Sequence, residues 1–155
     1  MSDRIKVAVV ISFVLLPVIG IAILKYSRPP GIEKVSAISI LPPRVVGDFQ
    51  PAEDLTTVFR EALSDIEGIR IQPPPSPAQI ADAGKDMKKL ADAVGADALV
   101  VTVLTADAGI VQLDVQIVDP ASGRVLYNNP YHSPRDQYPQ MIRAAGTAVR
   151  RALAR

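Results

Sequence analysis

The stretch IVQLDVQIV, residues 110–118, alternates apolar and polar side chains along its whole length. Successive side chains of a β-strand point to opposite faces of a sheet, so this pattern predicts a strand with one buried and one open face. The residues that follow, DPASG at 119–123, are of the types that form tight turns. Residues 124–127 then return as the partner strand, and the sequence predicts a β-hairpin.

Further strands are expected on the amino-terminal side of this hairpin. Residues 98–104 form a nearly continuous run of apolar, mostly β-branched side chains, which is typical of a strand covered on both faces. Residues 35–41 read as a short strand stopped by two prolines, and residues 69–71 as a briefer one. The hairpin therefore belongs to a larger sheet.

Helical spacing separates these strands. Between residues 54 and 66 the apolar side chains recur three and four positions apart, as on one face of a helix. Ser76 and Pro77 are typical of a helix start, and a longer helix is expected from Lys85 to a left-handed cap at Gly95. A last helix runs from about Tyr138 to the chain end. The order β-α-β-α-β-β-β-α predicts an α/β sandwich, a small mixed sheet with helices packed on it.

The amino-terminal part of the chain is different in character. No charged residue occurs between Val7 and Leu24, a length close to the ~20 apolar residues that span a bilayer as a helix. We expect a transmembrane helix at residues 7–25, after a cytoplasmic lead at 1–6 and before a linker at 26–34. Residues 35–155 then form one extracytoplasmic domain. A cleaved signal peptide is the alternative, but no small-residue cleavage site follows the run.

The orientation of this segment rests on a narrow charge difference. Arg4 and Lys6 precede the apolar run, and Lys25, Arg28 and Lys34 follow it, which is nearly a tie under the positive-inside rule. We expect the amino terminus inside and the carboxy-terminal domain in the periplasm, in a single-pass protein of the bacterial inner membrane. The apolar run then contacts membrane lipid.

Composition argues against most kinds of chemistry. The 155-residue chain has 17 basic and 16 acidic residues, a net charge of +1 that creates no field for nucleic acid. Cysteine is absent, which excludes disulfides and thiolate sites, and His132 is the single histidine, expected in a solvent-facing loop. No glycine-rich phosphate loop is present. We expect no enzymatic activity, no metal and no cofactor.

Four segments of the domain resemble the TolB amino-terminal-like domain family. Residues 38–42, ISILP, are similar to the family's opening "IAVLPF", and residues 62–71 resemble its "L…PGLRV". Residues 90–101 resemble "A…LGVDYVLEG", and residues 115–131 resemble "QLIDAATGEHLWSERY". Pro43 stands where the family often has Phe, and Tyr127 where it often has Trp. The resemblance implies a fold and an interaction role, and no catalytic activity.

The last helix carries an unbalanced set of basic side chains. Most of them fall opposite its apolar stripe, and they are the candidate partner-binding residues: Arg143, Arg150, Arg151 and Arg155. A solvated face that complements the helix carboxy terminus is the simpler interpretation. The expected function is a membrane-anchored, non-catalytic interaction module, an accessory or assembly subunit that binds another envelope or membrane protein. A ligand-sensing domain, or a secreted envelope-assembly component, is the alternative.

Overall fold

The computed structural model describes residues 31–51 and 54–154. The described part of the chain begins with the short 3-10 helix η1, and a second 3-10 helix, η2, precedes the last helix. In chain order the elements are η1 (Ile32–Lys34), β1 (Ala37–Ile40), β2 (Arg44–Val46), α2 (Leu55–Leu63), β3 (Arg70–Gln72), α3 (Pro77–Ala83), α4 (Met87–Val94), β4 (Ala98–Asp107), β5 (Ile110–Val118), β6 (Val125–Pro134), η2 (Arg135–Gln137) and α5 (Tyr138–Leu153).

The strands of the described residues form one six-stranded sheet of mixed direction. Its order is β3-β1-β4-β5-β6, and β2 pairs with the second half of β4. The pairs among β1, β2, β3 and β4 are parallel, whereas β4, β5 and β6 are antiparallel neighbours. The predicted hairpin and the small mixed sheet are thus confirmed.

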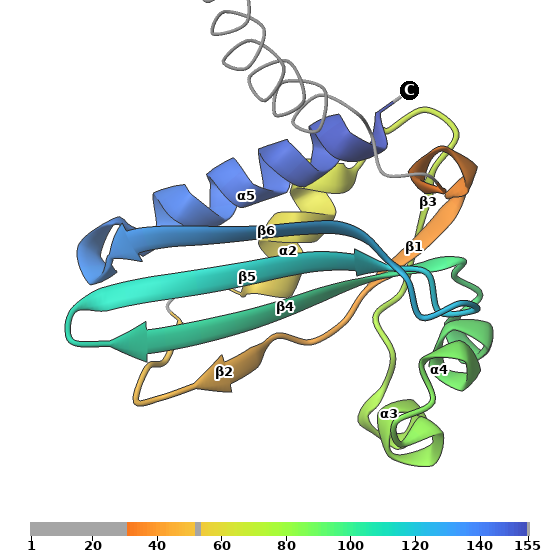
Figure 1. Ribbon diagram of the computed structural model, residues 1–155, viewed down its shortest axis with the longest axis horizontal. Helices are drawn as coiled ribbons and strands as arrows, with labels where there is room; N and C mark the ends of the chain where they lie inside the picture. The colour runs from red at the N-terminus through yellow and green to blue at the C-terminus, as the bar shows by residue number, and fades with distance from the viewer. Residues whose placement is uncertain (1–30, 52–53, 155) are drawn as a thin grey trace, which may run out of the picture.

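Helices α2 and α5 lie together on one face of this sheet (Figure 1). The alternation that predicted β5 is confirmed, because Val111, Leu113, Val115 and Ile117 are fully buried on that face. They pack with side chains of α2 and α5, of which Phe59 and Ile142 are fully buried. One apolar core therefore fixes both helices over the sheet.

The opposite face is covered by described residues only where β1 and β4 begin. There α3 and α4 pack at one end of the sheet (Figure 1), and Leu90, Ala91 and Leu99 are buried. From Val101 onward the residues of β4 on this face are half-buried or exposed. The expectation of a strand covered on both faces is therefore wrong beyond Val100, because the two short helices do not reach further along β4.

Asp97 ties the start of β4 to the start of β1. Its carboxylate accepts hydrogen bonds from the backbone N–H of Ser36 at 3.0 and 3.2 Å and from that of Ala37 at 3.1 Å. The Ser36 hydroxyl also donates to it at 2.6 Å. These partners lie about sixty residues earlier in the chain, so Asp97 joins distant segments.

Strand β2 and helix α3 were missing from the predicted order. β2 follows two prolines, is only three residues long and is exposed along its length, so no periodicity marks it. The helix start at Ser76 is confirmed, with a capping box between Ser76 and Gln79. That helix ends at Gly84, and a second cap at Asp86 begins α4, so two helices replace one.

β6 continues well past the predicted strand at 124–127. Asn128, Asn129 and Pro130 are residue types that favour turns, but they lie here in an edge strand, where an outward proline removes no ladder hydrogen bond. The loop predicted around His132 is therefore wrong, and His132 is an exposed residue of β6.

Among the described residues, no helix is both long and apolar enough to cross a membrane. The predicted lead, the predicted transmembrane helix and most of the predicted linker lie outside the described residues, because the description begins at Gly31.

Candidate functional site

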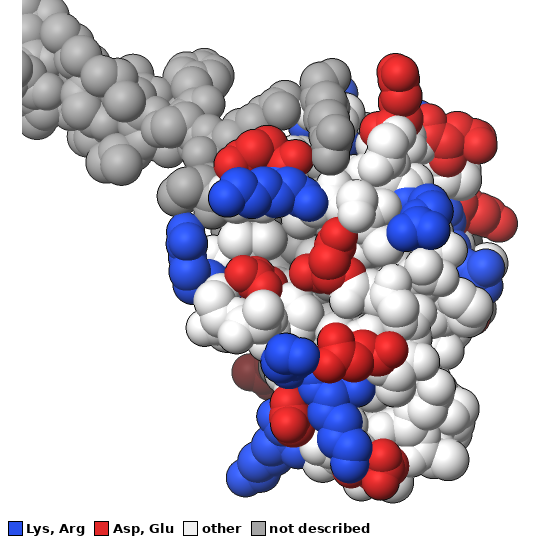
Figure 2. Space-filling model, turned by 90° about the vertical axis from the view of Figure 1, so that its right-hand side faces the viewer, with Lys and Arg blue, Asp and Glu red and all other residues white. Residues whose placement is uncertain are grey.

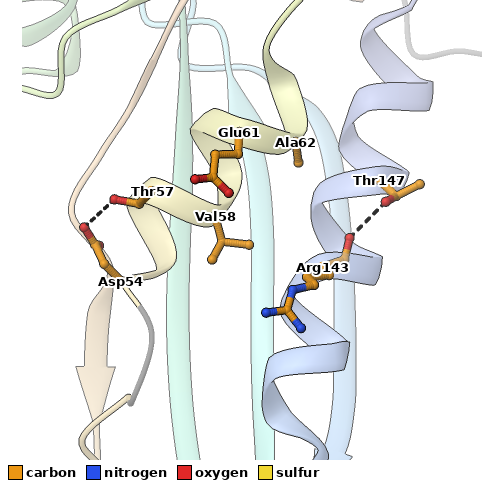
Figure 3. Close-up of a pocket in the computed structure, with 7 residues that line it drawn as sticks. All are labelled: Asp54, Thr57, Val58, Glu61, Ala62, Arg143 and Thr147. Carbon is orange, nitrogen blue, oxygen red and sulfur yellow. Dashed lines mark hydrogen bonds between the residues drawn. The ribbon is translucent and has the colours of Figure 1, made fainter.

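A groove runs between α2 and α5 on the outer side of the helical layer (Figure 3). Its volume is about 580 Å³. The residues that line it come from the start and exposed side of α2 and from the middle of α5: Asp54, Thr57, Val58, Glu61, Ala62, Arg143 and Thr147. Val58 and Ala62 are half-buried and give the groove an apolar floor.

Gly146 sets how closely the two helices approach. A Cβ atom built on it would lie 2.8 Å from the Cβ of Ala62, a distance that side chains essentially never adopt. Glycine in a helix interior costs about 1 kcal/mol relative to alanine, so its place in α5 is explained by this contact. The contact brings the helices together beside Ala62, which also lines the groove.

The polar side chains of the groove come from both helices. The Asp54 carboxylate caps α2, accepting from the backbone N–H of Thr56 at 3.1 Å and from the Thr57 hydroxyl at 2.8 Å. Glu61 is exposed on α2, and the Arg143 side chain extends toward α2 from α5 (Figure 3). The groove thus presents an acid and a base on opposite walls above an apolar floor.

Three of the four arginines singled out from the sequence are described, and their surroundings differ. Arg143 lines the groove, and Arg151 is exposed. Arg150 is half-buried, and its Nη1 donates to the carbonyl oxygens of Ala62 at 3.0 Å and Ser64 at 2.6 Å. A cation favours the carboxy-terminal end of a helix, so Arg150 stabilises the end of α2. Arg155 lies outside the described residues, and a role of these arginines in partner binding stays a prediction.

The α2 side of the groove was missed at the sequence level. Thr57 and Glu61 are four residues apart on the predicted helix, which places them on one face, opposite its apolar stripe. Nothing in that spacing distinguishes a groove wall from an ordinary solvated face. The distinction comes from α5, whose position over the sheet follows from long-range packing.

Tyr127 and Tyr131 of β6 are half-buried, and their hydroxyls are hydrogen-bonded to each other at 2.8 Å. Burial, together with this hydrogen bond, raises the pKa of Tyr127 above its usual value.

His132 lines a shallow hollow of about 310 Å³ between β6 and α5. The described part of the chain contains no cluster of three or more histidine or acidic residues that could hold a metal ion.

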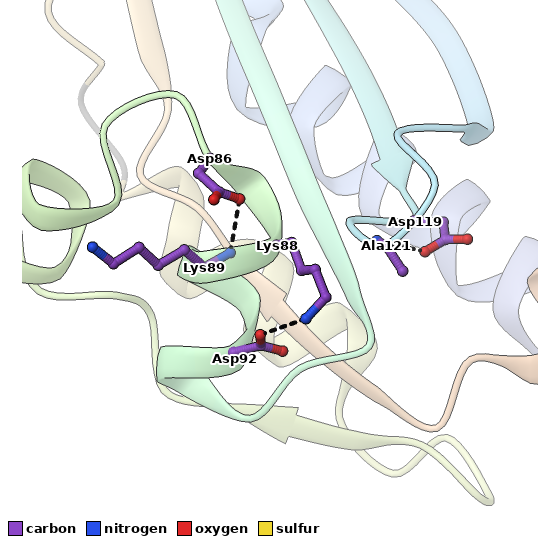
Figure 4. A network of polar contacts seen from close by, with 6 residues as sticks. All are labelled: Asp86, Lys88, Lys89, Asp92, Asp119 and Ala121. Atoms are coloured by element: carbon purple, nitrogen blue, oxygen red, sulfur yellow. Dashed lines mark hydrogen bonds and ion pairs between the residues drawn. The ribbon is translucent and has the colours of Figure 1, made fainter.

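The end of the molecule that carries α3 and α4 has a mixed surface. Figure 2 shows acidic and basic side chains interspersed there. Lys89 pairs with Asp82 at 3.2 Å. Lys88 pairs with Asp92 at 2.8 Å, and the Asp86 carboxylate accepts from the backbone N–H of Lys89 at the start of α4 (Figure 4). These exposed pairs neutralise one another locally and contribute little to stability. Asp82, Asp86 and Asp92 are all exposed.

The fold just described occurs in known bacterial proteins. PelC from Paraburkholderia phytofirmans, solved as a dodecamer, superposes with a TM-score of 0.58 over 83% of this chain and 95% of PelC, at 10% identity. The LpoB C-terminal domain from Salmonella enterica matches with a TM-score of 0.50 over 77% of this chain and 94% of that domain, at 14% identity.

TolB from Acinetobacter baumannii also matches, with a TM-score of 0.50 over 83% of this chain but 29% of TolB, at 18% identity. No protein-family model matches the sequence, and no curated protein is significantly similar to it. The expected TolB-like fold is therefore confirmed as a fold, shared with the LpoB domain. Membership of the TolB amino-terminal-like family stays a prediction.

Proposed function

We propose that this protein is a non-catalytic interaction module of the bacterial cell envelope, an accessory or assembly subunit that binds another protein in the groove between α2 and α5. In this proposal the apolar run at residues 7–24 anchors it in the inner membrane through lipid contact, and the domain lies in the periplasm. The α2–α5 groove is the observation that carries the proposal.

The groove has the composition expected of a docking site for a polypeptide. Val58 and Ala62 offer apolar area at its floor, while Glu61 and Arg143 offer charges of opposite sign on its walls. Interfaces between proteins commonly combine an apolar centre with a polar rim, and complementary charges fix the register of the partner. The contact between Gly146 and Ala62 holds the helices at a fixed spacing, so the groove is formed before a partner arrives.

The fold likeness supports the same class of function. The similar PelC was solved as a dodecamer, an example of this fold in an assembly of several chains. The envelope location rests on the apolar run and on the sequence resemblance to the TolB amino-terminal-like family. We infer from the same features that the partner is a membrane or envelope protein, and that nucleic acid is not bound.

A photo-crosslinking amino acid in place of Thr147 tests the groove in living cells. Thr147 is exposed and lines the groove, so irradiation should join the protein to one discrete partner. Asn128 is the matched control, because it is exposed on β6 and pairs with Gln116 on the uncovered face of the sheet. The same adduct from both positions, or none from Thr147, would contradict docking in the groove.

Charge reversal then tests the walls. Glu61→Arg and Arg143→Glu should each reduce the Thr147 adduct, and raised salt should weaken it because exposed charges are screened. Arg150 must be left unchanged in this experiment, since it stabilises the end of α2. Arg151→Glu is the control for net charge, and an equal loss with that variant would mean that the groove charges are not specific.

A further inference from the structure

The outer edge of β3 has two backbone groups without a partner among the described residues. β3 is the terminal strand of the sheet and pairs in parallel with β1 alone, with Ala37 opposite Arg70 and Ser39 opposite Gln72. The N–H of Arg70 donates to the carbonyl of Ser36 at 2.9 Å, which fixes the phase of the ladder. In a parallel pair alternate residues direct both backbone groups to the neighbour, so Arg70 and Gln72 face β1. The N–H and C=O of Ile71 therefore point away from the sheet.

A groove lies beside these two groups. It has a volume of about 390 Å³ and lies between Ile71 of β3 and the outward side of α2. The helix contributes Thr57, Arg60, Glu61 and Ser64, all of them exposed. The side chain of Ile71 is half-buried and lies on the same face of the sheet as its neighbour Ile38, the face that α2 covers. An edge strand with a helix beside it is an arrangement that receives an extended peptide as an added strand.

The outer edge of the sheet at β6 is protected against such pairing. The N–H of Arg135 donates to the carbonyl of Gly109 at 3.0 Å, so the backbone of Arg135 faces the β5 side. The backbone groups of successive residues face alternately toward and away from β5, so those of Pro130 and Pro134 face outward from β6. Neither proline has an N–H, and proline on an edge is a known device against strand addition. β3 ends at Gln72, and the carbonyl of the following Pro73 accepts from the Ser39 hydroxyl of β1 at 3.0 Å, so pairing is limited to a short segment around the donor at Ile71.

We propose that an extended segment of a partner protein adds to β3 as a further strand, in the groove between Ile71 and α2. One residue of that segment exchanges two hydrogen bonds with the N–H and C=O of Ile71. Its side chain points to the α2 side and packs on the side chain of Ile71, so a β-branched apolar residue fits there, with polar residues before and after it. The inference rests on the proposed function in taking a protein as the partner. It concerns the β3 side of α2, whereas the α2–α5 groove lies on the other side, and the two grooves share Thr57 and Glu61.

Amide hydrogen exchange tests the premise without any ligand. In the full chain in mild detergent, the amide of Ile71 should exchange much faster than those of Arg70 and Gln72, which donate to β1. Equal protection of all three amides would show that the edge is already occupied and would overturn the proposal.

A library of random linear peptides displayed on phage, selected on the full chain, supplies the probe. The best enriched peptide is then synthesised and its binding measured by fluorescence anisotropy. Ile71→Pro removes the outward donor and no hydrogen bond of the fold, so it should weaken binding about tenfold or more. Ile71→Val keeps the donor and should bind as the wild type does.

The same hydrogen bond can be removed from the peptide side, which leaves the protein untouched. N-methylation at the peptide residue that pairs with Ile71 should weaken binding by a similar factor, whereas N-methylation one residue away should not. Failure to select any peptide, or selected peptides that bind Ile71→Pro as tightly as wild type, would overturn strand addition. Adducts from Thr147 would in that case still support the α2–α5 groove, and selected peptides without Thr147 adducts would support β3 alone.

Discussion

Replacing Thr102 by valine should stabilise the protein. Thr102 lies in the middle of β4 opposite Val115, on the face that packs against the helices, and is 1% exposed. Its hydroxyl is the one side-chain polar atom in the described residues that is buried without a hydrogen-bond partner. Valine has nearly the same shape, so the substitution Thr102→Val exchanges the hydroxyl for a methyl group and leaves the packing intact.

The expected gain follows from the cost of the unpaired hydroxyl. Mutational data place the burial of such a group at about 1–3 kcal/mol, and one buried methylene-sized group adds roughly 0.8 kcal/mol of apolar burial. We therefore expect the free energy of unfolding to rise by about 2 kcal/mol. With a urea dependence of about 2 kcal/mol per molar, the unfolding midpoint should move up by about 1 M.

Urea unfolding followed by far-ultraviolet circular dichroism measures this, because the chain has no tryptophan for fluorescence. Thr105→Val is the matched control: Thr105 is in the same strand but on the uncovered face, where it is half-buried. That variant should leave the midpoint nearly unchanged. A lower midpoint for Thr102→Val would refute the reasoning, since it would mean that the hydroxyl is hydrogen-bonded in solution.

Four further predictions concern the core, the sheet, the pH dependence and the amino-terminal segment. Gly146→Ala should destabilise the protein by about 1–3 kcal/mol through the clash with Ala62, less about 1 kcal/mol of gained helix propensity. Adding Ala62→Gly in the double variant should restore much of the loss. If the losses of the two single variants simply add in the double variant, the contact is contradicted. Asp97→Ala should cost about 1–3 kcal/mol by thermal unfolding, because the start of β1 loses its acceptor; an unchanged midpoint would show that the carboxylate is dispensable. The pKa of Tyr127 is raised on folding, so its contribution to stability is complete below the unfolded pKa of about 10 and is lost as the pH rises above that value. In urea titrations Tyr127→Phe should reduce this loss of unfolding free energy at high pH. An unchanged dependence of the unfolding free energy on pH would assign the effect to another group. Mass spectrometry of protein extracted from membranes should detect peptides covering residues 7–24, whereas a mature amino terminus between residues 26 and 33 would identify a cleaved signal.

Local patterns predicted the elements whose environment is uniform along their length. The strict alternation of residues 110–118 became β5 with the expected face buried, and the helical spacing around Phe59 became α2. Patterns failed where the environment changes within one element. β4 is covered on both faces as far as Val100 and on one face afterwards, and a single apolar run does not show that change.

The grooves beside α2 could not be predicted from the sequence for a related reason. Arg143 and Arg150 are seven residues apart and were assigned to one solvated face of α5. Their roles separate because α2, more than eighty residues earlier, ends against Arg150 and leaves space beside Arg143. Likewise, the free donor at Ile71 depends on the phase of its pairing with β1, which no local pattern records.

The bonds between Asp97 and the start of β1 have a consequence for how the chain is made. β1 is a central strand, and its parallel neighbour β4 follows about sixty residues later, so the middle of the sheet cannot close while those residues are still unsynthesised. Closing so long a loop must precede the gain from the contacts, which makes such topologies slow to fold. In a nascent chain of this protein, β1 and β4 can therefore pair only after about the first hundred residues have emerged.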